Sequence, residues 1–295
     1  MKCKSPVLLG MHAAPCGQCI PCRINRRRLW MHRMMLEMTM HSENSFVTLT
    51  YNEENLPNGS SLEPKDAQDW LKRFRKRIAP LRVRYYLVGE YGDETQRPHY
   101  HAALFGFGSC LYGTTRNYRL QRSCCPRCDL VRETWGQGDI LLGSLTTESA
   151  QYVVGYVIKK MTSMEDARLT GRYPEFARMS RRPGIGSGAV PAIVQALEAF
   201  NLEKSQGDVP SALRHGNKIL PLGRYMRRLL RQALTGDPNA TPESQIERSK
   251  EMLAVLFDQE GHFSPEKSLS FRAQANIKGQ KVEARHSIYK RKQSL

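Results

Sequence analysis

The chain has 295 residues, of which 40% are hydrophobic and 25% are charged, as is ordinary for a soluble globular protein. Lys and Arg number 45 against 28 Asp and Glu, and the formal net charge of +17 indicates a partner that is a polyanion, above all nucleic acid. No apolar run approaches the roughly 20 residues of a membrane span and no signal peptide is evident, so we expect no membrane partner and an intracellular location.

The eight cysteines form two groups in the sequence. The groups are Cys16, Cys19 and Cys22, then Cys124, Cys125 and Cys128, with Cys3 and Cys110 apart. In a cytosolic protein, CxxC pairs are metal ligands more often than disulfides. The halves contributed by Cys16, Cys19 and Cys22 and by Cys125 and Cys128 therefore predict a structural zinc site, although they lie further apart than in a zinc ribbon. Reduced cysteines without metal are the alternative.

The first half of the chain alternates basic helices with strands. Residues 1–22 read as irregular and residues 23–41 as a helix whose first part carries Arg23, Arg26, Arg27 and Arg28. These arginines could contact DNA phosphates or form a solvated face, and the net charge favours phosphates. Alternation predicts a strand over residues 45–51, and apolar residues at helical spacing predict a helix from about residue 63 to 78.

A hairpin of strands over residues 84–90 and 99–105 carries the first candidate site. In a strand His99 and His101 share one face, whereas Tyr100 points to the other face and into the core. Two imidazoles so placed can reach one metal ion. The hairpin can bring Glu90 beside them as a third ligand, with Asp93 or Glu94 as alternatives.

The second half begins with a cysteine- and glycine-rich stretch, residues 106–135, that we expect to be a loop, followed by a strand over residues 138–143. A helix is predicted from residue 144 or 147 to about 164, with Tyr152 and Tyr156 on one face and Lys159 and Lys160 a turn later. Residues 172–188, with Arg181 and Arg182, read as a basic loop. Further helices are expected over residues 190–202, from about 220, and over 246–257. The last thirty residues read as a flexible basic tail.

These features make a chemical set. Tyrosine hydroxyls are poor nucleophiles, with a reference pKa near 10. A divalent metal that withdraws charge from a phosphodiester makes phenolate attack feasible. Two histidines and one carboxylate leave coordination positions open for phosphate and water. A neighbouring lysine stabilises a phenolate or positions a phosphate.

The order of these motifs resembles the HUH superfamily of rolling-circle replication initiators. His99-Tyr100-His101 matches its metal motif, Tyr156-Val157-Ile158-Lys159 its nucleophile motif, and Phe46–Tyr51 its first strand. The finer resemblance, over about residues 15–186, is to the initiators of gokushovirus-like microviruses. It rests on the Cys16-x-x-Cys19-x-x-Cys22-Arg23 start, on Arg97–His101, and on the helix from Tyr152 to Lys160.

The resemblance implies an α+β fold with a central antiparallel sheet of about four to five strands and a helical C-terminal extension. We expect a cysteine-rich segment over 1–44, the nuclease core over 45–190, a helical extension over 191–263 and the tail over 264–295. It further implies that His99, His101 and Glu90 hold Mg²⁺ or Mn²⁺, and that Tyr156 forms a 5′-phosphotyrosine with origin DNA.

In the same scheme Tyr152 acts in alternation with Tyr156, and a free 3′-OH serves a host DNA polymerase, with a host helicase as a further partner, in the host cytoplasm. Some phage relatives have a lysine just before the second tyrosine, where this chain has Gly155, which leaves Lys159 and Lys160 as candidates. Two rival interpretations stay open: a non-catalytic, zinc-stabilised DNA-binding protein, and a relaxase or single-strand transposase with the same chemistry.

Overall fold

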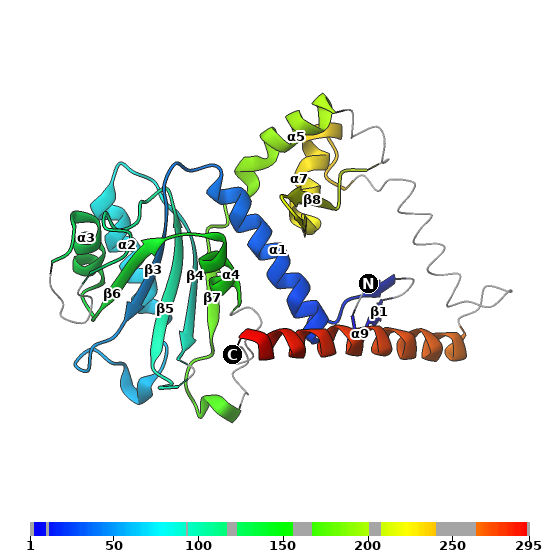
Figure 1. The fold of residues 1–295 in the computed structure, drawn as a ribbon, viewed down its shortest axis with the longest axis horizontal. Coiled ribbons are helices and arrows are strands. Elements are labelled where there is room, and N and C mark those ends of the chain that lie inside the picture. The colour runs from blue at the N-terminus through cyan, green and yellow to red at the C-terminus, as the bar shows by residue number, and fades with distance from the viewer. Residues whose placement is uncertain are drawn as a thin grey trace. The chain divides into compact units, whose positions relative to one another are not determined.

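The structure, a computed structural model, describes residues 3–9, 12–92, 94–116, 123–155, 167–200, 208–239 and 264–293. The chain divides into two compact units, one of residues 30–189 and one of residues 1–29 together with 190–295 (Figure 1). Each unit is described by itself. The predicted division at residues 45, 191 and 264 stays a prediction.

The unit of residues 30–189 is built around a five-stranded antiparallel sheet with the strand order β6-β3-β5-β4-β7 (Figure 1). Its strands are β3 (Asn44–Thr50), β4 (Arg84–Tyr91), β5 (Pro98–Phe105), β6 (Ile140–Ser144) and β7 (Phe176–Met179). The predicted α+β fold with an antiparallel sheet is thereby confirmed. The predicted β4–β5 hairpin forms, and β5 lies between β3 and β4.

Helices cover both faces of this sheet, and each face has its own hydrophobic core. The helices are α1 (Ile20–Met38), which also enters the other unit, α2 (Pro64–Ile78), α3 (Pro126–Trp135) and α4 (Thr147–Gly155). The short 3₁₀ turns are Asn58–Ser60, Ala167–Leu169 and Ser187–Ala189. Side chains of α2 and α3, such as Trp70 and Trp135, fill the core on one face. Met34 of α1 and Val153 of α4 belong to the core on the other.

The alternation of the strands decides which residues face which core. Along β3, Val47 and Leu49 are fully buried against α2 and α3, whereas Phe46 and Thr48 point to the face of α4. Because residues opposite each other in a sheet share a face, His101 lies on the α4 face with Thr48. This face carries the candidate site.

The second unit holds short strands and three described helices. The hairpin strands are β1 (Val7–Leu9) with β2 (His12–Ala14), and β8 (Ala212–His215) with β9 (Lys218–Pro221). The helices are α5 (Val190–Ala199), α7 (Gly223–Thr235) and α9 (Pro265–Gln293). Asp208, next to β8, accepts hydrogen bonds from Arg227 and Arg231 of α7 and so fixes that helix.

Four local predictions need correction. Residues 126–135 form helix α3 rather than a loop, because Pro126 begins the helix and Gly136, at a positive φ, ends it. The expected loop over 172–188 contains β7, which gains its backbone hydrogen bonds from the edge of β4. The expected irregular start contains the β1–β2 hairpin.

The fourth correction concerns the tail. Residues 265–293 form α9 instead of a flexible tail, since this stretch is rich in helix-forming Lys, Arg, Gln, Glu and Ala. The helix predicted over 246–257 lies outside the described residues. Among the described helices, none is both long enough and apolar enough to cross a membrane.

Candidate functional site

Glu90, His99 and His101 meet on the α4 face of the sheet. Glu90 is directly opposite His99 in the β4–β5 register, and His101 lies two residues further along β5 on the same face. The Glu90 Oε1 atom lies 2.7 Å from Nε2 of His99 and 3.1 Å from Nε2 of His101. Glu90 is 1% and His101 5% exposed, so the site is a nearly dry pocket open on the side of His99.

The other ring nitrogens show how the imidazoles are oriented. His99 Nδ1 lies 3.1 Å from the carbonyl oxygen of Arg97, which can only accept a hydrogen bond. With its proton on Nδ1, a neutral His99 turns the lone pair of Nε2 toward the Glu90 carboxylate. Two electron-rich atoms 2.7 Å apart need a proton or a cation between them.

A divalent ion fits this donor set. One carboxylate and two imidazoles are common ligands of divalent metals, and their ligand atoms all lie within 4.8 Å of one another. Two ligands at right angles, each about 2.1 Å from an ion, are about 3.0 Å apart. The observed separations of 2.7 and 3.1 Å lie on either side of that value. The structure therefore contains a site suited to a metal, without indicating which one.

Hydrogen bonds also stabilise the charged form of the carboxylate. Burial acts to raise the pKa of Glu90, but hydrogen bonds from His101 and His99 and the charges of these rings outweigh it. The pKa of Glu90 consequently lies below its ordinary value, and the carboxylate is ionised at neutral pH.

Three further side chains surround His101. The Thr48 hydroxyl lies 2.9 Å from Nδ1 of His101 and fixes the ring from β3. Phe46 stacks on the ring, with centroids 5.5 Å apart and planes 17° apart. Tyr152 of α4 meets His101 edge to face at a centroid distance of 5.3 Å, and its side chain is 50% exposed. The helix with the predicted tyrosine thus lies over the triad. The sequence reading assigned Thr48 only to the sheet and missed this contact.

The remaining residues expected near this site divide into three groups. Tyr156, Lys159, Lys160 and Asp93 lie outside the described residues. Glu94, the other alternative ligand, is exposed and does not join the triad. Tyr100 is fully buried on the opposite face and hydrogen-bonds to Tyr51, as predicted for a core residue.

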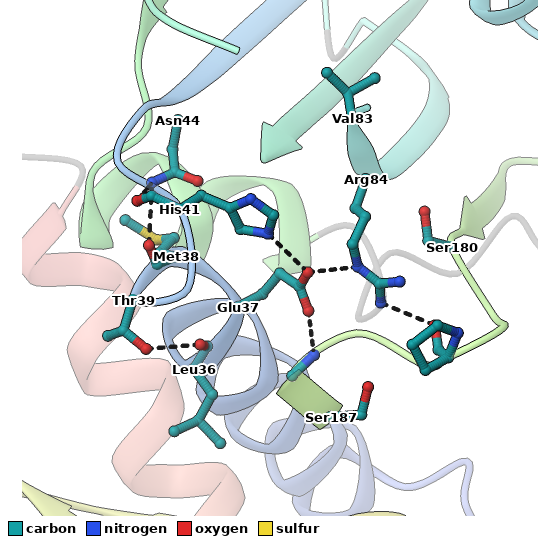
Figure 2. Close-up of polar contacts among 12 residues, drawn as sticks. Leu36, Glu37, Met38, Thr39, His41, Asn44, Val83, Arg84, Ser180 and Ser187 are labelled. Carbon is teal, nitrogen blue, oxygen red and sulfur yellow. Dashed lines mark hydrogen bonds and ion pairs between the residues drawn. The ribbon is translucent and has the colours of Figure 1, made fainter. Parts of the chain in front are cut away.

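A second buried carboxylate lies near the start of β4. Glu37 of α1, 2% exposed, accepts hydrogen bonds from Nε of Arg84 and from the backbone N–H of Gly186, and lies 3.0 Å from Nε2 of His41 (Figure 2). Arg84 also donates to the carbonyl oxygen of Pro183 (Figure 2). Gly186 has a φ of +83°, and a Cβ there would lie 2.9 Å from the Arg33 carbonyl oxygen, so this close approach requires glycine. These bonds connect α1, β4 and the segment after β7.

A cavity of about 1280 Å³ opens beside this cluster, with arginines along its walls. They are Arg75, Arg82, Arg84, Arg178, Arg181 and Arg182. Arg181 and Arg182, which the sequence indicated as DNA contacts, are both exposed. A single-stranded polyanion is the ligand class that such a wall attracts.

Arg23, Arg26, Arg27 and Arg28 all lie in the first turns of α1, in the other unit. Arg26 and Arg28 are exposed, and Arg28 donates to the carbonyl oxygen of Ile219. A DNA contact for these arginines stays a prediction.

The cysteines gather into two groups of four. The N-terminal cysteine cluster consists of Cys3, Cys16, Cys19 and Cys22, and the loop cysteine cluster of Cys110, Cys124, Cys125 and Cys128. The expected pairing of the two CxxC halves in one site is wrong, because each half lies in a different unit and is completed by a distant cysteine.

Each cluster has one thiol that ionises readily. Burial acts to raise the pKa of Cys16, but backbone N–H groups and neighbouring thiols lower it to about 6. The same balance lowers the pKa of Cys125 to about 7.

Comparison with known proteins gives a consistent result for the sheet and α4. Residues 44–161 match a family model of phage replication-associated proteins, that of ORF2. The chain is 34% identical over 171 residues to the replication-associated protein VP4 of Bdellovibrio phage phiMH2K, covering 54% of this chain and 52% of that protein. It is 30% identical over 183 residues to the replication-associated protein ORF2 of Spiroplasma virus 4, covering 59% and 56%.

A third relative, the replication-associated protein ORF4 of Chlamydia phage 1, is 24% identical over 247 residues, covering 82% of this chain and 59% of that protein. The matches thus span little more than half the length of these relatives. No solved structure matches the chain. The resemblance to replication proteins of microvirus-like phages is confirmed.

Proposed function

We propose that this relative of phage replication-associated proteins is a rolling-circle replication initiator that nicks and rejoins single-stranded origin DNA. The convergence of Glu90, His99 and His101 under a helix that presents Tyr152 is the observation that carries the proposal. The similarity over residues 44–161 supports it, because this range contains the triad, Tyr152 and Tyr156.

Glu90, His99 and His101 would hold Mg²⁺ or Mn²⁺, and Thr48 would keep His101 oriented. When bound, the ion withdraws charge from the non-bridging oxygens of the scissile phosphate. The buried walls around Glu90 and His101 keep water away from the carboxylate, which strengthens its electrostatic interactions. The open side at His99 leaves room for the DNA phosphate.

Tyr156 is the proposed nucleophile. Its oxygen bonds to phosphorus as the bond from phosphorus to the 3′-oxygen breaks, and the leaving oxygen takes up a proton to give a 3′-OH. The 5′-phosphate stays esterified to the tyrosine, and Lys159 or Lys160 stabilises the phenolate before attack. In the reverse direction, a 3′-OH attacks this ester and restores the phosphodiester.

Tyr152 is the proposed second nucleophile. Residues four apart lie on the same face of an α-helix, so an α4 that continues regularly would present Tyr156 one turn beyond Tyr152. Tyr152 would cleave the regenerated origin after one circle, while the freed 3′-OH reseals the old strand. Its exposure and its ring contact with His101 support this role.

The arginine-lined cavity is the proposed path of the DNA away from the nick. Arg84 and Glu90 lie at opposite ends of β4, six residues or about 20 Å apart. A strand of several nucleotides would cover this distance, with its phosphates near Arg181 and Arg182. The arginines of α1 would add affinity that does not depend on sequence. A host DNA polymerase would extend the 3′-OH with a host helicase ahead of it, in the host cytoplasm.

The test uses a random-sequence pool of single-stranded DNA with Mn²⁺, followed by mass spectrometry of tyrosine peptides linked to nucleotides. We expect adducts on Tyr156 and Tyr152, their loss in a Tyr152→Phe/Tyr156→Phe variant, and unchanged DNA binding by that variant. Tyr173→Phe is the matched control, because Tyr173 is also exposed but lies outside the site. DNA binding without any adduct would contradict the proposal and favour a non-catalytic DNA-binding protein.

A further inference from the structure

Each cysteine cluster is built from a CxxC pair in or near the first turn of a helix and from cysteines brought in by the tertiary fold. In the N-terminal cysteine cluster, Cys19 and Cys22 flank the start of α1, and Cys3 comes from before the β1–β2 hairpin. In the loop cysteine cluster, Cys125 and Cys128 begin α3, and Cys110 comes from the segment after β5. The two clusters together use all eight cysteines.

The sulfur separations match those of a tetrahedral metal site. Four sulfurs each about 2.3 Å from a zinc ion lie about 3.8 Å from one another. Sγ of Cys19 is 3.8 Å from Sγ of Cys3, and Sγ of Cys110 is 3.7 Å from that of Cys124 and 3.9 Å from that of Cys125. A disulfide would need about 2.05 Å, and all eight cysteines are free.

Hydrogen-bond donors surround the sulfurs of both clusters. Backbone N–H groups of Cys16, Cys19 and Lys4 point at Sγ of Cys3, Cys16 and Cys19, at 3.3 to 3.4 Å. In the loop cysteine cluster, the N–H groups of Tyr112 and Arg116 point at Cys110 and Cys124 at 3.4 and 3.3 Å. Such donors stabilise negative charge on sulfur, which a metal-bound thiolate carries.

We propose that the two clusters are independent structural zinc sites, so that each chain holds two Zn²⁺ ions, each bound by four thiolates. Sulfur ligands and tetrahedral spacing select Zn²⁺, whereas the carboxylate and imidazoles of the triad form a harder site. Each ion displaces the protons of its thiols to solvent as it binds. Because no ligand is shared with the triad, this proposal stands whether or not the chain nicks DNA.

Each site would hold together a segment that has little core of its own. The N-terminal cluster fastens the three-residue strands β1 and β2 to the start of α1. The loop cluster fastens the segment after β5 to α3, where Thr115 also bonds to the backbone of Leu142 in β6. In such short segments, metal binding supplies folding free energy that apolar burial does not.

The test measures the metal content of the full chain, produced with zinc in the medium and dialysed, by mass spectrometry of the elements. We expect two zinc per chain, and one in each of the variants Cys16→Ser/Cys19→Ser and Cys125→Ser/Cys128→Ser. Glu90→Gln is the control and should keep two zinc, since the triad lies elsewhere.

A second measurement needs no variant that could fail to fold. Titration of the unmodified chain with an organic mercurial, read with a zinc-sensitive dye, should release two zinc for eight thiols. Any other zinc stoichiometry in the unmodified chain, iron in place of zinc, or cysteine pairs joined as disulfides would overturn the proposal.

Discussion

Glu37 and Glu90 are both buried carboxylates beside histidine, yet their surroundings differ in one decisive respect. Glu37 receives a permanent positive charge from Arg84 and an N–H from Gly186, in addition to His41 (Figure 2). Around Glu90 the contacts to its Oε1 come from the imidazoles of His99 and His101. At Glu37 the chain itself supplies the cation, whereas at Glu90 two metal-ligating side chains take its place.

The comparison separates a structural role from a chemical one. A buried carboxylate paired with arginine holds elements together, because removing either partner leaves an uncompensated charge. A buried carboxylate beside two imidazole nitrogens offers a donor set for a divalent ion. We therefore expect changes at Glu37 to act on stability and changes at Glu90 to act on chemistry.

The largest effect is expected for Glu90→Gln. The amide lacks the charge that the donor set contributes to a metal, so we predict a loss of DNA nicking of about 100-fold or more with DNA binding unchanged. Nicking rates and binding curves on the same oligonucleotide measure this. Glu94→Gln is the control, because Glu94 is an exposed carboxylate just beyond β4. If both variants nick alike, Glu90 is not a ligand.

Glu37→Gln should destabilise the unit of residues 30–189 without removing the metal site. Loss of the charge leaves Arg84 without its buried partner and costs about 3 kcal/mol, or about 6–12 °C in melting temperature. Thermal unfolding measures this change. The control is Glu43→Gln, which removes an exposed partner of Arg127 and should cost less than about 1 kcal/mol. Equal melting temperatures for the two variants would refute the structural role of Glu37.

Thr48→Val should weaken the candidate metal site by a smaller amount. The hydroxyl contact fixes the ring of His101, and loss of such outer contacts lowers metal affinity by about tenfold. Calorimetric titration with Mn²⁺ measures the affinity. Thr50→Val on the same strand is the control, because the Thr50 hydroxyl donates to the carbonyl oxygen of Asp139. An Mn²⁺ affinity unchanged by Thr48→Val would show that the contact does not orient a ligand.

The smallest effect is expected at the arginine-lined cavity. Replacing Arg181 and Arg182 by Ala should lower the salt dependence of single-stranded DNA binding by about 1.4 in the log–log slope, from about 0.7 per phosphate contact. Binding titrations over a range of salt concentrations measure the slope. Arg77→Ala, an exposed arginine of α2 that does not line the cavity, should leave it unchanged. A slope equal to that of the unmodified chain would exclude phosphate contacts at these arginines.

Local patterns in the sequence were sufficient for the core strands. The alternation of polar and apolar residues located β3, β4 and β5 to within one residue at each end, and it placed His99 and His101 on one face. It also placed Tyr100 in the opposite core. The period of two in a strand is a property of neighbouring residues, so it can be read without knowing the fold.

Patterns without a clear period misled the reading. Helix α3 was hidden because its sequence is short and rich in cysteine and charge, although Pro126 and Gly136 mark its ends. Strand β7 has only four residues and depends on the free edge of β4 for its hydrogen bonds. In both cases the neighbouring elements decide the structure.

By itself, the sequence determined the identity of the triad candidates, the helix of Tyr152 and the resemblance to phage replication initiators. Only the tertiary structure decided that Glu90 rather than Glu94 joins the histidines and that Cys3 and Cys110 complete two separate clusters. It alone showed that Glu37 is satisfied by Arg84. The physical reason is that these contacts join residues far apart in the chain, and sheet order and loop closure, which no local period encodes, bring them together.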